Sequence, residues 1–198
     1  MNKIVKNTLI LLVISLVAGL ALSFVYELTK DTIAQAGLAQ EQSIYSHFFP
    51  DGMSFEVYAG FEVSEANDII EIAGFTDEQI HNMVTALGEG ENVLGYIVNT
   101  SSASGFGGDI QLLVGISLDG TVIGLDFLVI NETPGLGMPA TQPDFTGQFA
   151  GINVESFTVT TTGESGDGVI DALSGATITT NAVVSAVNAA LYYFNSQL

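Results

Sequence analysis

One long uncharged run near the N-terminus constrains this chain more than any other feature. Residues 7–26 contain no charged side chain and are rich in Leu, Ile and Val. A helix of this length, at about 1.5 Å per residue, spans the roughly 30 Å hydrocarbon core of a bilayer. The run therefore predicts one transmembrane helix, with the rest of the chain outside the lipid.

The charges around this run predict how the helix is oriented. Lys3 and Lys6 precede it, whereas Glu27 and Lys30 follow it. Because basic residues flank the cytoplasmic end of a membrane helix, we expect a cytoplasmic N-terminus and an extracytoplasmic domain. A cleaved signal peptide is the competing interpretation, since residues 21–23 are small enough for a cleavage site. The run is longer than the usual h-region of about 7–15 residues, and this favours an anchor.

Charge after the anchor is almost all of one sign. The chain has 22 acidic and 3 basic residues and a net charge of -19. No Lys or Arg follows Lys30, whereas 21 of the acidic residues do, because only Glu27 precedes it. Such a surface repels nucleic acid, which we exclude as a partner. An anionic ligand must be held by backbone amides, hydroxyls, a helix terminus or a covalent bond.

The residue types that usually bind metals are scarce. There is no cysteine, which excludes disulfides, Cys-ligated zinc and iron–sulfur clusters within this chain. His47 and His81 are isolated, with no second histidine three or four residues away. We predict no metal site.

Periodicity and turn residues predict the first elements after the anchor. We expect a helix over residues 31–49, ended by a Pro-Asp-Gly sequence, and then a strand over 55–58. Residues 69–72 are predicted as a weak strand. Residues 76–79 match a capping box, which predicts a short helix reaching about residue 87.

The second half of the chain has stronger β patterns. Strands are predicted over residues 93–100, 109–117 and 121–130, the last two joined by a tight Asp-Gly turn. A glycine-rich loop containing Phe106 separates the first two. A final amphipathic helix follows, with Thr180 or Asn181 as its N-cap.

These elements predict an α+β fold. The expected architecture is one transmembrane helix followed by an extracytoplasmic domain, in which helices flank a mixed or antiparallel sheet. We divide the chain into an N-terminal stub with the transmembrane helix (1–30), a helical and short-strand connecting region (31–92) and a ligand-binding core (93–198).

Two short motifs carry the chemistry. Residues 171–177 read Asp-Ala-Leu-Ser-Gly-Ala-Thr and end just before the last helix. The first-turn N–H groups of a helix lack intrahelical partners and lie at the positive end of its dipole, so they receive a phosphate well. The local alternative is an ordinary loop whose Ser and Thr cap the helix. Residues 132–137 read Glu-Thr-Pro-Gly-Leu-Gly, a rigid turn suited to lining a ligand.

With these motifs in this order, the chain resembles the FMN-binding RnfG subunits of Rnf ion-translocating electron-transport complexes. It resembles more distantly the NqrC subunits of the sodium-pumping NADH:quinone reductase. The likeness covers nearly the whole chain: one anchor, a helix ending in Phe-Pro, the glycine-rich loop and both motifs. Asn131 departs from the pattern, because family members often have a histidine near this position.

The resemblance implies a covalent cofactor. Thr177 would carry FMN through a phosphoester, installed by a flavin transferase that uses FAD, and Asp171 matches the acidic start of the attachment motif. The turn at residues 132–137 would lie against the isoalloxazine ring. The implied cofactor-binding residues are Thr177, Ser174, Gly175, Ala176, Thr180, Asp171, Glu132, Thr133, Leu136, Gly137 and Phe106. Without a cation in the domain to stabilise reduced flavin, we expect a low midpoint potential.

The resemblance also implies a function. The chain would relay electrons within a complex that couples ferredoxin:NAD+ electron transfer to Na+ or H+ movement. Its partners would be other membrane and peripheral subunits, including a second flavinylated subunit. Two alternatives remain open: the same flavin module in another extracytoplasmic electron-transfer system, and a flavin-free anchored subunit with a structural or ligand-binding role.

Overall fold

The protein divides into two compact units, with the division between residues 41 and 42. The structure, a computed structural model, describes residues 3–164 and 166–198, with the side chains of residues 31–36, 38 and 39 outside the description. The first unit is most of helix α1 (Lys3–Phe48). Its segment Lys3–Lys30 is long and apolar enough to cross a membrane. The helix predicted from the uncharged run is therefore present.

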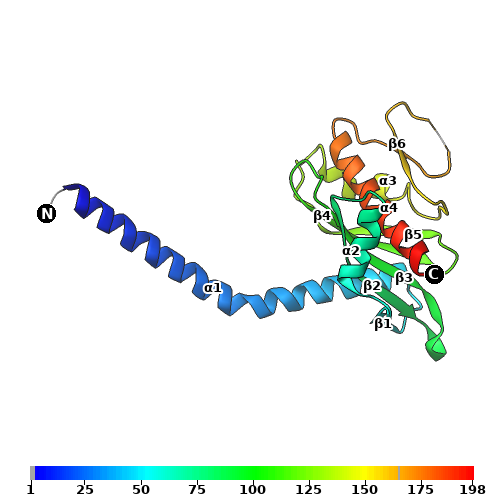
Figure 1. Ribbon diagram of the computed structural model, residues 1–198, viewed down its shortest axis with the longest axis horizontal. Helices are drawn as coiled ribbons and strands as arrows, with labels where there is room; N and C mark the ends of the chain where they lie inside the picture. The colour runs from blue at the N-terminus through cyan, green and yellow to red at the C-terminus, as the bar shows by residue number, and fades with distance from the viewer. Residues whose placement is uncertain (1–2, 165) are drawn as a thin grey trace. The chain divides into compact units, whose positions relative to one another are not determined.

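The second unit is built on an antiparallel sheet. Its five strands lie in chain order: β1 (Ser54–Val57), β2 (Glu78–Leu87), β3 (Val93–Ser102), β4 (Ile110–Ser117) and β5 (Val122–Val129) (Figure 1). The last three confirm the strands predicted over 93–130. Because β1 pairs with β2 and β2 pairs with β3, the sheet runs across the boundary predicted between residues 92 and 93.

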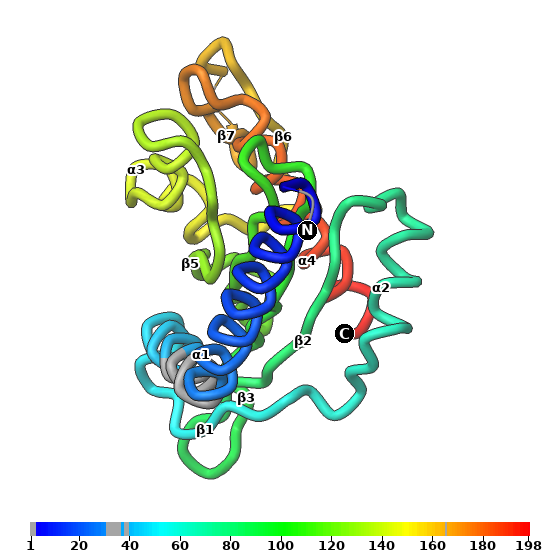
Figure 2. Tube along the Cα trace, turned by 90° about the vertical axis from the view of Figure 1, so that its left-hand side faces the viewer, coloured from blue at the N-terminus to red at the C-terminus, as the bar shows by residue number. Residues whose placement is uncertain are grey.

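A smaller parallel pair lies at one end of this unit. It consists of β6 (Thr158–Thr160) and β7 (Val169–Asp171), and it lies near the short helix α3 (Pro143–Thr146) (Figure 2). Two 3-10 turns complete the fold, η1 (Glu89–Glu91) and η2 (Met138–Thr141). Strand β7 ends at Asp171, so the parallel pair delivers the chain to the start of the 171–177 motif.

The main core lies between the sheet and two helices. Helices α2 (Val63–Ile72) and α4 (Thr177–Gln197) pack on β2, and α4 continues over β3 and β4. Burial of apolar side chains is the main favourable term in folding, and α4 contributes a continuous buried face to it. Its buried apolar residues are Ala182, Val183, Val184, Ala186, Val187, Ala189, Ala190, Leu191, Tyr193 and Phe194.

A second core lies on the other face of the sheet. The last residues of α1 and the residue after it supply Ile44, Tyr45, Phe48 and Phe49. They pack with side chains of three strands, namely Val84, Ala86, Ile97 and Leu113. The helix predicted over 31–49 therefore ends as a packing element of the domain.

Two predicted elements between residues 63 and 87 are wrong. Residues 69–72 are the end of helix α2, and residues 78–87 are strand β2. The Asn67 side chain of α2 accepts a hydrogen bond from the Ile80 N–H (2.9 Å) and donates to the Ile80 carbonyl (3.0 Å). This tertiary pairing joins α2 to β2 and overrides the local helix-start signal.

The start of the last helix also differs from the prediction. Helix α4 begins at Thr177, with Ala176 as its N-cap, and no side chain caps it. Thr180 and Asn181, the predicted caps, lie inside the helix. The helix start therefore coincides with the end of the 171–177 motif.

Candidate functional site

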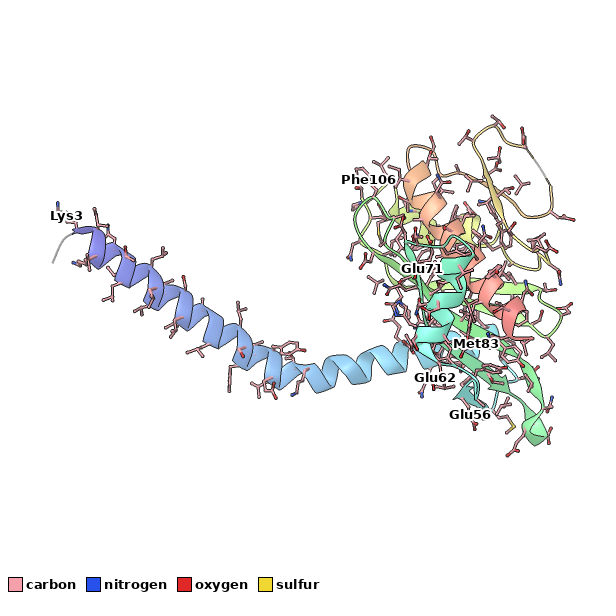
Figure 3. All side chains as sticks on the ribbon, viewed as in Figure 1. Lys3, Glu56, Glu62, Glu71, Met83 and Phe106 are labelled. Carbon is pink, nitrogen blue, oxygen red and sulfur yellow. The ribbon has the colours of Figure 1, made fainter. Side chains whose placement is uncertain are left out.

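A cavity of about 320 Å³ lies at the first turn of α4. The glycine-rich loop between β3 and β4, the 132–137 turn and the start of α4 meet around it. The lining residues are Phe106, Glu132, Thr133, Leu136, Gly137, Gly175, Ala176, Thr177, Ile178 and Thr179. Figure 3 places Phe106 at one end of the domain, in the loop beside the start of α4.

The fold brings together both motifs, which are far apart in sequence. The Leu136 side chain lies 3.3 Å from where a Cβ on Gly175 would stand, so the turn and the attachment motif are in contact. Every cofactor-binding residue predicted from the sequence lines this cavity except Asp171, Ser174 and Thr180.

Asp171 and Ser174 line a different cavity, of about 560 Å³. There the Gln148 side chain holds the Asp171 backbone: its Oε1 accepts from the Asp171 N–H at 2.7 Å, and its Nε2 donates to the Asp171 carbonyl at 3.4 Å. The side chains of Asp171 and Ser174 are both exposed on this side of the motif, away from the first cavity.

Thr180 is fully buried beneath the motif. Its Oγ1 accepts a hydrogen bond from the Leu173 N–H (3.1 Å) and donates to the Ala176 carbonyl (3.0 Å). The hydroxyl is therefore used within the protein, and Thr180 holds the motif on the helix instead of facing the cavity.

Thr177 differs from the other threonines of the first turn. It is exposed and lines the cavity, whereas Thr179 and Thr180 are buried. No side chain caps α4, and its first turn contains no acidic residue, so no carboxylate of the helix itself offsets its dipole at this end. The exposed Thr177 and the free N–H groups of the first turn of α4 thus lie at the same cavity.

Two lining residues come from positions that the motifs did not mark. Neither Ile178 nor Thr179 is among the cofactor-binding residues predicted from the sequence. Both belong to the first turn of α4. A prediction that started the helix at Thr177 would have included both residues in the site, because the first three residues of a helix surround its free N–H groups.

Glu132 joins the glycine-rich loop to the turn. Its side chain is 6% exposed, and its Oε1 accepts hydrogen bonds from the Phe106 N–H (2.8 Å) and the Gly107 N–H (3.3 Å). Buried carboxylates need such partners, since an unpaired one is costly to remove from water. The described residues contain no group of three or more His, Asp or Glu side chains that could hold a metal ion.

Comparison with known proteins decides the family. A family model described as an FMN-binding domain matches residues 105–192, and the RnfG N-terminal region matches residues 1–47. Over 194 residues the chain is 34% identical to the RnfG subunit of the Na(+)-translocating ferredoxin:NAD(+) oxidoreductase complex of Acetobacterium woodii, covering 96% of this chain and 91% of that one. The chain belongs to the RnfG family.

Other relatives agree with this assignment. The RnfG subunit of the ion-translocating oxidoreductase complex of Methanosarcina acetivorans is 34% identical over 197 residues, covering 99% of this chain and 97% of the relative. Its counterpart in a proton-translocating ferredoxin:NAD(+) oxidoreductase complex from Clostridium ljungdahlii is 40% identical over 103 residues, which are 52% of this chain and 55% of that one. The complexes of these similar RnfG chains are thus named for different translocated ions, Na(+) in one case and protons in another.

A solved structure shows the same fold. The NqrC subunit of the Na(+)-translocating NADH-quinone reductase from Parabacteroides distasonis aligns with a TM-score of 0.52 at 23% identity, covering 73% of this chain and 76% of that one. The predicted α+β fold class is confirmed, and so is the family that the two motifs indicated. Residues 105–192 of this RnfG chain form an FMN-binding domain. Its N-terminal apolar helix fits a single-pass membrane subunit.

The cavity residues fit FMN. Ligand pockets combine an apolar wall with a few placed polar groups. Here Phe106, Leu136 and Ile178 supply apolar side chains, and the first turn of α4 supplies N–H donors for a phosphate.

Proposed function

We propose that this chain carries FMN on Thr177 and relays electrons within an Rnf-type ferredoxin:NAD+ oxidoreductase. The observation that carries the proposal is the position of Thr177. It is the first residue of α4, it is exposed, and it lines the cavity of the FMN-binding domain. Membership of the RnfG family supports a role in an Rnf-type complex, and the cavity is large enough to suggest where the flavin would bind.

The bond would be a phosphoester between Thr177 Oγ1 and the FMN phosphate. A flavin transferase would form it from FAD, so that the Thr177 hydroxyl loses its proton and AMP leaves. The ester keeps one negative charge on the phosphate, and the first-turn N–H groups of α4 receive that charge. Asp171 and Ser174 would contact the transferase, a role that their exposure on the opposite side of the motif supports.

The charge of the domain favours covalent attachment. Arg and Lys usually help to hold a free phosphate, but none follows Lys30. The 21 carboxylates that follow Lys30 would also oppose a dianion. An ester halves the phosphate charge and prevents loss of the cofactor outside the cell.

The other cavity residues would orient the ring. We assign the apolar side chains of Phe106, Leu136 and Ile178 to the isoalloxazine, with the 132–137 turn as one wall. When bound, the flavin supplies the redox chemistry, and these side chains hold it and exclude water. This arrangement suits an electron relay better than a self-contained catalyst.

The partners follow from the family. The chain would work with other membrane and peripheral subunits of the complex, including a second flavinylated subunit. Lys3 and Lys6 lie at the N-terminal end of the apolar segment, and this supports a cytoplasmic N-terminus and an extracytoplasmic flavin domain. The ion stays open, since similar relatives are named for Na+ and for protons.

In-gel flavin fluorescence tests the attachment. The full chain is expressed together with the flavin transferase and run on a denaturing gel. We expect a fluorescent band at the mass of this chain and its loss in Thr177→Val, because valine has the size of threonine but no hydroxyl.

Thr179→Val is the matched control, since Thr179 lines the same cavity two residues later. We expect it to remain fluorescent. A fluorescent Thr177→Val band, or fluorescence lost in Thr179→Val alone, would refute attachment at Thr177.

A further inference from the structure

We propose that Glu132 has two roles at this site: it clamps the glycine-rich loop to the cavity, and its charge lowers the reduction potential of the flavin. The second role rests on the proposed function, because it requires a flavin in the cavity. The first concerns the protein alone.

The clamp is visible in the hydrogen bonds of one carboxylate oxygen. Glu132 Oε1 accepts from the N–H groups of Phe106 and Gly107, more than twenty residues earlier in the chain. The backbones are in close contact here, since a Cβ on Gly107 would stand 2.0 Å from the Asn131 carbonyl oxygen. Glu132 therefore sets the position of Phe106, whose side chain is 70% exposed at the cavity.

The second carboxylate oxygen lies on the α4 side of the turn. A Cβ on Gly137 would stand 2.6 Å from Glu132 Oε2 and 2.8 Å from Thr179 Oγ1. All three residues line the cavity. Among the described residues, the hydrogen bonds to the Glu132 side chain both end on Oε1. Oε2 is not among the buried side-chain atoms that lack a partner, so it keeps some access to solvent in the cavity. One oxygen of the carboxylate is thus occupied by the loop, and the other is left in the cavity wall.

The charge of this carboxylate is not balanced by a cation. No Lys or Arg follows Lys30, and the described residues of the domain form no ion pair with Glu132. Like charges repel more strongly in a poorly solvated wall than in water. Two electrons from a neighbouring redox centre and one proton from water convert a neutral flavin ring to a monoanion. Glu132 opposes that added charge and so lowers the potential.

Glu132→Gln separates the charge from the clamp. Its amide oxygen still accepts from both N–H groups, but it is neutral. In a potentiometric titration of the full FMN-loaded chain, we expect at least a tenfold higher ratio of reduced to oxidised flavin at a fixed ambient potential. For a two-electron couple this equals about 30 mV. Glu155→Gln removes the same charge from an exposed residue outside the cavity, and we expect no shift.

Amide hydrogen exchange tests the clamp without flavin. In a Thr177→Val background, the Phe106 and Gly107 amides should stay protected in Glu132→Gln. They should exchange faster in Glu132→Asp, whose shorter side chain keeps the charge but retracts the oxygen. In the flavin-loaded chain, Glu132→Asp should keep a potential nearer to the wild type. Glu132→Ser is a second neutral variant and should raise the potential even where the glutamine variant fails to fold.

The outcomes divide cleanly. A potential unchanged in the neutral variants, with flavin retained, overturns the charge role; equal exchange in all variants overturns the clamp. A shift in Glu155→Gln as large as in Glu132→Gln also overturns the charge role, because net charge alone would explain it. A wild-type chain that carries no flavin after coexpression refutes the proposed function instead. The hydrogen-exchange measurement, which needs no flavin, then still tests the clamp.

Discussion

At the scale of single residues, Thr177 and Thr180 show how neighbouring threonines serve different purposes. Thr177 is exposed and lines the cavity, whereas Thr180 uses its hydroxyl to join Leu173 to Ala176. Both were predicted as cofactor-binding residues. The sequence motif marks the segment that meets the cavity, but only the start of the folded helix decides that Thr177 is exposed there and Thr180 is buried.

Thr180→Val should destabilise the fold around residues 171–177, because it removes both hydrogen bonds of the Thr180 hydroxyl. The substitution keeps the volume but leaves the Leu173 N–H without its acceptor, and an unpaired buried donor costs about 1–3 kcal/mol. We expect this loss in the free energy of unfolding of the full chain, measured with denaturant in detergent. Flavin incorporation should fall as well.

Thr161→Val is the control, because Thr161 is an exposed threonine outside the motif. If Thr180→Val matched it in both stability and flavin content, the Thr180 hydroxyl would have no positioning role.

Asp171 and Ser174 show a limit of motif reading at this scale. They are close to Thr177 in sequence, yet they line a separate cavity. A turn over residues 173–176 contains Ser174 and separates Asp171 from the helix; it is closed by the hydrogen bond from the Ala176 N–H to the Leu173 carbonyl (3.0 Å). A linear motif does not reveal such a reversal of side-chain direction, because the hydrogen bond depends on the folded backbone.

At the scale of elements, the end of α1 is part of the domain. Phe48 is 8% exposed and packs with Ile44, Phe49 and strand residues on the sheet face opposite α4. The sequence predicted the helix but not the face of the sheet that receives it. Periodicity within a single helix carries no information about its partner.

Phe48→Ala should destabilise the domain through this second core. Truncating a buried Phe typically costs about 3–5 kcal/mol. We expect a loss of this size in the free energy of unfolding, followed by far-UV circular dichroism in detergent.

Phe24→Ala serves as the control, since Phe24 lies in the apolar segment of α1 with its side chain exposed. It should leave unfolding of the domain unchanged. A loss below about 1 kcal/mol in Phe48→Ala would mean that the second core contributes little to folding.

Strand β2 shows why some elements escaped prediction. Asp77 and Glu78 belong to a sequence that matches a helix start, but they accept hydrogen bonds from the hydroxyls of Ser104 (2.8 Å) and Ser102 (3.0 Å). Both partners lie more than twenty residues further along the chain. Strands β3 to β5 were predicted well because their turn and alternation signals are local, whereas β2 depends on these distant contacts.

At the scale of the whole molecule, charge and hydropathy predict most of the organisation. The apolar helix, the basic residues before it and the acidic domain after it are all readable from the sequence. The cavity is not, because it forms where three segments between residues 106 and 179 converge. Only the two motifs, taken together, indicated that these segments meet.

The predicted orientation can be tested with one cysteine. The natural chain has none, so Glu155→Cys, at an exposed position of the domain, gives a single reporter. We expect a membrane-impermeant maleimide to label it in intact cells, because the basic residues retain the N-terminus inside.

A cytoplasmic thiol protein should stay unlabelled in the same cells. Labelling of Glu155→Cys only after the cells are broken would place the domain in the cytoplasm.

The most direct measurement of the central claim is peptide mass spectrometry of this chain isolated from its native membranes. The account predicts that the peptide containing Thr177 carries the mass of FMN less one water, with fragmentation assigning the addition to Thr177. An unmodified Thr177 peptide, or the same addition on another residue, would contradict it.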